Sequence, residues 1–144
     1  MKRAAGRTSA PVLGVGVDLV ENERMRSALR RWGRTFRHKV FQPAEQAYCD
    51  GKAEPWRHYA GRFAIKEAVS KAFGTGIGTH LGWLDIEVRR DPDTGAPSVR
   101  LSAKGGRLAR RRGVGRVLVS LSHTRHYAVA QALLVGGAGK EKIR

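Results

Sequence analysis

Hydrophobic and polar residues alternate from Val12 to Val20, which predicts a β-strand. One face of this strand is entirely aliphatic, whereas the opposite face carries two glycines. Because glycine inside a strand often marks the close approach of another backbone or of a ligand, we expect Asp18 to emerge from a surface kept clear of side chains. The aliphatic face comprises Leu13, Val15, Val17 and Leu19, and the opposite face comprises Gly14, Gly16, Asp18 and Val20.

Two helices are predicted next. Residues 21–39 have a helical pattern that would break at Gly33, and they carry seven Lys and Arg residues but no acid between Arg24 and Lys39. A shorter helix begins at Pro43, because proline suits the first position of a helix. We expect its inward-facing side chains to be those of Ala44, Ala47 and Tyr48.

A third helix, from Pro55 to a terminating Gly74, carries most of the candidate chemistry. Its apolar residues recur with a helical period, and at about 100° per residue Glu67 falls on the same stripe. A carboxylate therefore occupies a position where a hydrophobic side chain would be expected. The stripe comprises Trp56, Tyr59, Ala60 and Phe63, and Ser70 and Lys71 flank the carboxylate one turn later.

The C-terminal half is predicted to contain a hairpin, a short basic helix and a second antiparallel pair of strands. The order β-α-α-α-β-β-α-β-β predicts a small single-domain α+β fold with a mostly antiparallel sheet and a central buried helix. The predicted strands lie at 84–88, 98–101, 117–121 and 127–135, and the predicted helix lies at 103–112.

A chain of 144 residues that is 41% hydrophobic can bury one modest core, so we expect a single domain at 12–135. The flanking stretches, 1–11 and 136–144, have the composition of flexible tails, and the first is basic. The single cysteine, Cys49, excludes an internal disulfide framework and a zinc ribbon. No apolar run is long enough to span a bilayer, and the N-terminal apolar stretch makes a poor signal peptide. We therefore expect a cytosolic protein without a membrane partner.

Charge narrows the list of partners. The chain has 28 Lys and Arg residues against 12 Asp and Glu residues, which gives a formal net charge of +16. Such a field attracts polyanions or acidic proteins. A non-enzymatic RNA- or DNA-binding module is therefore the alternative to an enzyme, although no RNP, KH or helix-turn-helix signature supports it.

Asp18 and Glu67 are the first candidates for chemistry. Two carboxylates on otherwise apolar elements can hold Mg²⁺, which keeps several waters and takes further oxygens from a substrate phosphate. The structural alternative is that Asp18 caps the following helix and that Glu67 pairs with Lys71 in an i, i+4 arrangement.

Basic residues on the third helix suggest a phosphate site. Arg62, Lys66 and Lys71 can neutralise phosphates, and the loop at 74–78 can present backbone N–H groups. The alternative is a solvated basic face, and the Gly-x-Gly-x-Gly loop is a weak signal because no Walker A sequence is present. His123, at the end of a predicted strand, is by itself more typical of a hydrogen-bonded structural residue.

Three separated segments combine these features. The first segment, residues 14–24, begins Gly-Val-Gly-Val-Asp-Leu-Val-Glu. The second, residues 61–78, contains Lys-Glu-Ala, then Lys-Ala, and ends with Gly-Thr-Gly-Ile-Gly. The third, residues 119–131, begins Val-Ser-Leu-Ser-His-Thr. Together they resemble the holo-acyl-carrier-protein synthase family of phosphopantetheinyl transferases. The resemblance covers roughly residues 12 to 135, nearly the whole expected domain.

The resemblance implies that a carrier-protein serine attacks the pyrophosphate of coenzyme A, takes the 4′-phosphopantetheine group and releases 3′,5′-ADP. Asp18 and Glu67 match the family's magnesium ligands, and with Lys71 they form the expected catalytic set. Glu67, or a water held by the metal, is the expected base. The positions that match the coenzyme A site are Arg62, Lys66, Ser70, Lys71, Gly74, Gly95, Pro97, His123 and Thr124.

The resemblance also implies an acidic acyl carrier protein as partner and a homotrimer with active sites at the subunit interfaces. Thr94 and His126 depart from the family pattern near the adenine contacts and in one loop. The carrier protein can belong to a fatty-acid synthase or to a polyketide synthase. The resemblance does not explain the second basic run, at 104–116. The arginines placed to dock the carrier are Arg24, Arg26, Arg30 and Arg31.

Overall fold

The structure is a computed structural model that describes residues 10–137. The order of elements is the predicted one, β-α-α-α-β-β-α-β-β, with one short 3₁₀ turn before the hairpin. The elements are β1 (Val12–Glu21), α1 (Asn22–Val40), α2 (Pro43–Asp50), α3 (Pro55–Ala72), η1 (Trp83–Asp85), β2 (Ile86–Arg90), β3 (Pro97–Leu101), α4 (Ala103–Arg111), β4 (Val114–His123) and β5 (Tyr127–Gly136).

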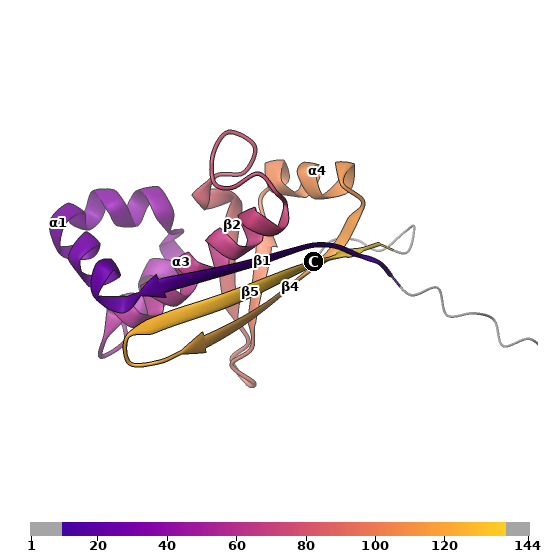
Figure 1. Cartoon of the computed structure of the whole chain (residues 1–144). Helices are drawn as coiled ribbons and strands as arrows, with labels where there is room; N and C mark the ends of the chain where they lie inside the picture. The colour runs from indigo at the N-terminus through magenta and orange to yellow at the C-terminus, as the bar shows by residue number, and fades with distance from the viewer. Residues whose placement is uncertain (1–9, 138–144) are drawn as a thin grey trace, which may run out of the picture.

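Three long strands form an antiparallel sheet in the order β1-β5-β4, and α3 lies against one face of it (Figure 1). The glycines of β1 allow this contact. A Cβ atom on Gly14 would meet the carbonyl oxygen of Ala72 at 2.2 Å, and one on Gly16 would meet that of Ala68 at 1.9 Å. The bare face of β1 is therefore covered by a helix backbone, and Asp18 stands at the edge of this packed face rather than on an open surface.

The second sheet is the β2–β3 hairpin, with Val88 paired to Val99. Its apolar side chains join α3, α4 and the long sheet in the larger hydrophobic core. α3 contributes eleven buried residues and contacts every strand of the long sheet, which confirms the predicted α+β fold with a central buried helix. Because the apolar side chains of α3 are packed in the core, the orientation of this helix is fixed, and with it the position of each charged residue around its axis.

The first two helices test two local predictions. α1 departs from helical geometry at Gly33, where φ is 48° and ψ is −124°, so the predicted break is present. The predicted inward face of α2 is confirmed for Tyr48, which packs against the second hydrophobic cluster, and is wrong for the two alanines. Ala44 and Ala47 are exposed, and the buried residues of this helix are Glu45 and Cys49. Helical periodicity alone favours burying the alanines, whereas a charged partner on α3 buries the glutamate instead.

Near the two predicted domain boundaries, the structure describes residues 10–11 and 136–137. β5 runs one residue past the expected end, to a buried Gly136, whose N–H donates to the carbonyl of Pro11 at 2.8 Å. The rest of the predicted tails, at 1–9 and 138–144, lies outside the described residues. Within residues 10–137, no helix is long and apolar enough to cross a bilayer.

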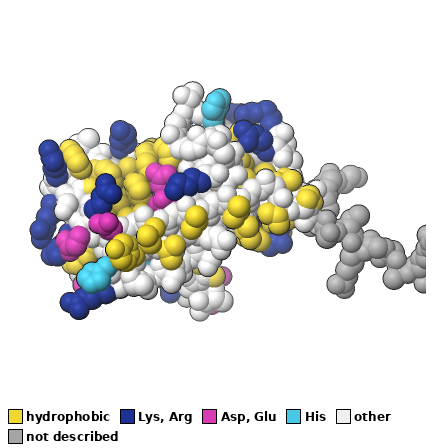
Figure 2. Space-filling view, in the orientation of Figure 1, with side chains coloured by type: hydrophobic (Ala, Val, Ile, Leu, Met, Phe, Trp, Pro, Cys, Tyr) yellow, Lys and Arg dark blue, Asp and Glu magenta, His cyan; other side chains and the backbone are white. Residues whose placement is uncertain are grey.

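The face of the long sheet opposite α3 is apolar and open. Figure 2 shows a row of hydrophobic side chains along β1. Val17 and Leu19 are 59% and 62% exposed, and the register places Val129 of β5 beside Leu19. Single exposed apolar residues are ordinary, but a continuous patch on a sheet face is typical of an interaction surface. The exposed members of this face are Leu13, Val15, Val17, Leu19, Leu118, Tyr127 and Val129.

Candidate active site

Asp18, Glu67 and Lys71 meet where β1 crosses α3. The Nζ atom of Lys71 lies 3.0 Å from Oδ1 of Asp18 and also donates to the carbonyl of Val17 at 3.1 Å. Lys71 stays half exposed, whereas the Asp18 side chain is 14% exposed. Neither structural alternative for these residues is observed, because Lys71 pairs with Asp18 instead of Glu67, and the N-cap of α1 is Glu21.

Asp18 and Glu67 line one groove of about 380 Å³. The groove lies between β1, α1 and α3, and Arg24, Phe36 and Phe63 contribute to its wall. Burial raises the pKa of the Glu67 carboxyl, the negative charge of Asp18 raises it further, and Lys71 lowers it in part. Two carboxylates that repel one another in a part-buried groove are arranged to hold a positive charge.

This donor set fits Mg²⁺. Among residues 10–137 no three His, Cys, Asp or Glu side chains gather as a closed metal cage. Mg²⁺ does not require such a cage, because it commonly uses one or two carboxylates and completes its shell with water and phosphate oxygens. Three carboxylates line this groove, those of Asp18, Glu21 and Glu67, and Asp18 and Glu67 are the two that the family resemblance implies as metal ligands.

A second cluster lies at the N-terminal part of α3. The Arg62 guanidinium is stacked 4.0 Å from the centre of the Tyr48 ring, and its Nε atom has no hydrogen-bond partner within residues 10–137. The His123 ring lies against Gly61, where a Cβ atom would meet it at 2.8 Å. Burial lowers the pKa of His123, and Arg57 and Arg62 lower it further. This concentration of positive charge suits an anionic ligand.

The two clusters point in different directions. Arg62 and Glu67 are five residues apart on one helix, which places them about 140° apart around its axis. A single chain therefore does not bring all the predicted site residues into one pocket. Asp18, Glu67 and Lys71 come together on one side of α3, and Arg62 and His123 come together on another.

We expected Lys66 to contact phosphate at the surface, but the structure buries its side chain. It is fully buried, and its ammonium donates to Glu45 at 2.7 Å, to the carbonyl of Trp83 at 3.0 Å and to that of Ile86 at 2.6 Å. Burial lowers the pKa of Lys66, and Glu45 partly offsets this effect. All three N–H groups are used, so within this chain Lys66 joins α3 to α2 and the hairpin instead of offering a phosphate contact.

The Ser70 hydroxyl and the N–H groups of the glycine loop also form hydrogen bonds within the chain. The Ser70 hydroxyl is buried and donates to the carbonyl of Glu67 at 2.8 Å. The N–H of Gly74 donates to Lys71, those of Thr75 and Gly76 donate to the Ser70 carbonyl, and that of Gly78 donates to Leu81. These bonds terminate α3, and Gly74 has the positive φ of 75° that such an ending favours. The expected row of free loop N–H groups is therefore absent among these four residues.

The remaining predicted coenzyme contacts lie at two turns. Gly95 and Pro97 are at the end of the β2–β3 hairpin, where Gly95 has φ of 78° and donates to the carbonyl of Asp91. Thr124 is in the β4–β5 turn, where its hydroxyl accepts from the N–H of Tyr127 at 3.0 Å. Both turns are exposed enough to meet a ligand, but no side-chain contact joins them to Asp18 or Glu67.

The docking arginines occupy two rows on α1. Arg24 and Arg31 are seven residues apart and therefore lie on one face, whereas Arg26 and Arg30 are four apart and lie on another. Arg24 lines the Asp18–Glu67 groove and also a neighbouring groove of about 400 Å³ together with Arg31. Arg26 instead stacks 4.3 Å from the centre of the Trp56 ring and pairs with Glu23 at 3.5 Å.

Residues 14–132 match the family model described as the 4'-phosphopantetheinyl transferase superfamily. The chain belongs to this superfamily. It is 46% identical over 125 residues to the holo-[acyl-carrier-protein] synthase of Syntrophus aciditrophicus, a match that covers 87% of this chain and 97% of the relative. It is also 46% identical over 131 residues to the enzyme of that name from Ruminiclostridium cellulolyticum, covering 90% of this chain and 97% of the relative.

Solved structures of the same family share the fold. The Neisseria meningitidis holo-[acyl-carrier-protein] synthase is 27% identical with a TM-score of 0.80 and covers 86% of this chain and 98% of its own. The Helicobacter pylori enzyme, solved in complex with coenzyme A, is 31% identical with a TM-score of 0.74 and covers 83% of this chain and 98% of its own. These relatives favour the predicted transferase over the nucleic-acid-binding alternative.

Several residues of this phosphopantetheinyl transferase family member were missed from the sequence. Tyr48 holds the Arg62 guanidinium, and the ring of His58 lies 6.4 Å from that of His123. Glu45 neutralises Lys66. A spacing signal was available for His58, which precedes Arg62 by four residues on the same helix face. The residue pattern within α2 does not indicate that Glu45 or Tyr48 contacts α3, because the two helices are joined by a loop whose path the pattern does not predict.

Proposed function

We propose that this chain is a magnesium-dependent holo-[acyl-carrier-protein] synthase, which transfers 4′-phosphopantetheine from coenzyme A to a serine of an acidic acyl carrier protein and releases 3′,5′-ADP. The observation that carries the proposal is the groove where Asp18 and Glu67 lie beside Arg24 of the basic helix. Relatives named for this activity match nearly the whole described chain. The site thus combines carboxylates for a metal with a cation for an acidic partner.

Asp18 and Glu67 would hold the magnesium ion. When bound, Mg²⁺ would neutralise charge on the phosphate oxygens of coenzyme A. Lys71 lies within 3.0 Å of Asp18 and is half exposed, so its ammonium can move from the carboxylate to a phosphate oxygen. Glu67 is our candidate for the base that takes the proton of the carrier serine, because its carboxylate lines the groove beside Asp18.

Arg62 and His123 would bind coenzyme A in a site completed by a second copy of the chain. Two observations support this assignment. Arg62 lies about 140° from Glu67 around α3, and neither Arg62 nor His123 lines the Asp18–Glu67 groove, so the two clusters are not in one pocket of this chain. The long sheet also leaves an aliphatic face exposed, which includes Val17 and Leu19. We propose a homotrimer that buries this face, as the family resemblance implies.

The decisive activity test is incubation with coenzyme A, Mg²⁺ and an apo acyl carrier protein, followed by intact mass spectrometry. We expect the mass of the carrier to increase by one phosphopantetheine group, and we expect no increase when its acceptor serine is replaced by alanine. Carriers from fatty-acid and polyketide synthases, tested side by side, would define the preferred partner. An unmodified carrier from both sources would contradict the proposal.

A mixing experiment tests the shared site. Glu67→Gln and Arg62→Gln remove residues of the two separate clusters, and each variant alone should be inactive or nearly so. If sites are built from two chains, unfolding and refolding the variants together should restore part of the activity, because some interfaces then contain both intact clusters. Light scattering should show a trimer. A monomer with full activity would contradict the assembly.

Carrier docking is tested by two charge reversals on α1. Arg24→Glu changes the residue that lines both grooves, whereas Arg30→Glu makes the same change on the other row. We expect Arg24→Glu to raise the KM for the carrier protein more than Arg30→Glu does, with the KM for coenzyme A nearly unchanged in both. Equal effects would mean that α1 acts only through its total charge.

A further inference from the structure

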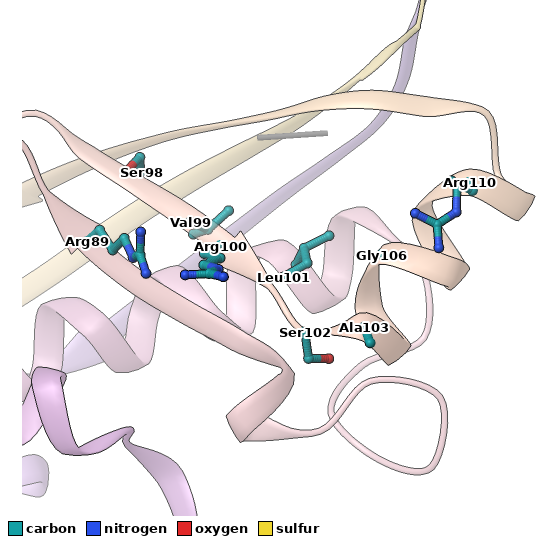
Figure 3. Close-up of a pocket in the computed structure, with 9 residues that line it drawn as sticks. All are labelled: Arg89, Ser98, Val99, Arg100, Leu101, Ser102, Ala103, Gly106 and Arg110. Carbon is teal, nitrogen blue, oxygen red and sulfur yellow. The ribbon is translucent and has the colours of Figure 1, made fainter. Parts of the chain in front are cut away.

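A pocket of about 560 Å³ opens between β3 and α4 (Figure 3). None of the residues assigned above to the metal, to coenzyme A or to the carrier protein lines it. Its volume falls within the range of sites for small molecules, which extends from about 300 to 1,000 Å³. The lining residues are Arg89, Ser98, Val99, Arg100, Leu101, Ser102, Ala103, Gly106 and Arg110.

Three guanidinium groups meet at this pocket from separate elements. Figure 3 shows Arg89 and Arg100 next to one another on the two strands of the hairpin, with Arg110 across the pocket on α4. Arg89 and Arg100 are exposed, and so is Arg110. Their convergence is a product of the tertiary fold, since Arg89 and Arg110 are 21 positions apart in the sequence.

Little negative charge offsets these arginines. Arg89 pairs with Glu87 at 3.4 Å, and Glu87 stands opposite Arg100 in the hairpin register. Within residues 10–137 neither Arg100 nor Arg110 forms an ion pair, and the nearby Asp85 lies 3.8 Å from Lys104. One acid therefore faces three guanidinium groups. Like charges that line one pocket repel one another, and an anionic ligand would reduce that repulsion.

We propose that this pocket binds a phosphorylated small molecule of nucleotide size. Guanidinium groups recognise phosphate through paired N–H donors, and three of them can engage more than one phosphate. The pocket is larger than a single phosphate requires, and Leu101 and Ala103 provide apolar wall for the remainder of the ligand. Such a site gives Arg110 a role, and with it part of the basic run at 104–116 that neither coenzyme A nor carrier docking explains.

The test is calorimetric titration of the whole chain with ATP and with tripolyphosphate in the absence of coenzyme A, which is itself a phosphorylated nucleotide and would compete for the pocket. Arg100→Gln and Arg110→Gln each remove a charge that lines the pocket. Arg107→Gln is the matched control, because Arg107 is an exposed arginine of the same helix that does not line it. We expect each lining variant to raise the Kd for ATP about tenfold and the control to raise it less than about twofold.

Several outcomes would overturn the proposal. Equal weakening by Arg107→Gln would mean that ATP responds only to general positive charge. Absence of saturable binding to both ATP and tripolyphosphate would remove the site, and binding of an RNA 20-mer without either small anion would assign the surface to a polyanion instead. Carrier modification measured without ATP should be the same in Arg110→Gln and wild type, so failure of this proposal is distinguishable from failure of the proposed transferase activity.

Discussion

Two lysines of α3 pair with carboxylates in opposite surroundings. Lys66 and Glu45 are 2.7 Å apart and both are 0% exposed, whereas Lys71 and Asp18 are 3.0 Å apart with exposed fractions of 49% and 14%. The buried carboxylate also accepts from the N–H groups of Gln42 and Val88, so its pair is part of a fully bonded network. The exposed pair is open to water and to a ligand. Similar chemistry, five residues apart, thus supports the fold in one place and, in our proposal, catalysis in the other.

The largest effect on stability should come from breaking the buried pair. Lys66→Met leaves the Glu45 carboxylate and two backbone carbonyls without their donor, and we expect a loss of about 3–5 kcal/mol in the free energy of unfolding. Urea denaturation of the purified variant measures it. The double variant Glu45→Gln/Lys66→Met should recover part of the loss, because the unpaired charge is gone. A loss below about 1 kcal/mol would contradict the structural role of Lys66.

The reverse pattern is expected for the exposed site. Asp18→Asn and Glu67→Gln remove charged groups while keeping their shapes, and each should lower kcat/KM by about 100- to 1,000-fold. The midpoint of urea unfolding should stay close to wild type, because neither residue is bonded into the core network. Near-normal Mg²⁺-dependent turnover in either variant would contradict the metal assignment.

Lys71→Met compares the roles of the two lysines most directly, because it is the same substitution as Lys66→Met, made in the exposed ion pair instead of the buried one. Surface ion pairs contribute about 0–1 kcal/mol, so stability should change little. Coenzyme A binding, measured by calorimetry, should weaken by about tenfold because a phosphate contact is lost. If Lys71→Met is largely unfolded at room temperature, and the fraction that stays folded binds coenzyme A normally, then the role of Lys71 is structural.

The smallest effect should come from His58, which is partly buried, and from His123, which is exposed. Burial lowers the pKa of both rings below the ordinary value of 6.5, and their positive neighbours add to this shift. The unfolded chain therefore binds protons more readily, so the free energy of unfolding should fall as the pH drops through 6.5 towards the folded pKa.

His58→Gln should make this dependence shallower when unfolding is compared at pH 7.5 and at pH 5.5. The matched control is His80→Gln, because His80 is in an exposed loop outside this pair of rings. An unchanged slope in His58→Gln, or an equal change in His80→Gln, would show that the cluster does not couple protonation to folding.

The sequence by itself determined the order of the elements, and its motifs supplied the candidates for the chemistry. Alternation in β1 and the apolar stripe of α3 identified both elements, because burial of one face imposes its period on the sequence. The three motifs also identified Asp18, Glu67 and Lys71, which the fold brings together. These features are local or are recorded in short motifs, so tertiary contacts are not needed to recognise them.

Only the tertiary structure decided which charged residues of α3 are available. Lys66 and Ser70 match the family motif as well as Lys71 does, yet the packing of α2 and the hairpin buries them. The glycines of β1 suggested close approach, but the sequence did not say that α3 itself makes it. Likewise, nothing local brings Arg89, Arg100 and Arg110 to one pocket. Such contacts depend on how separate elements pack, and a period read along one element does not encode the position of its neighbours.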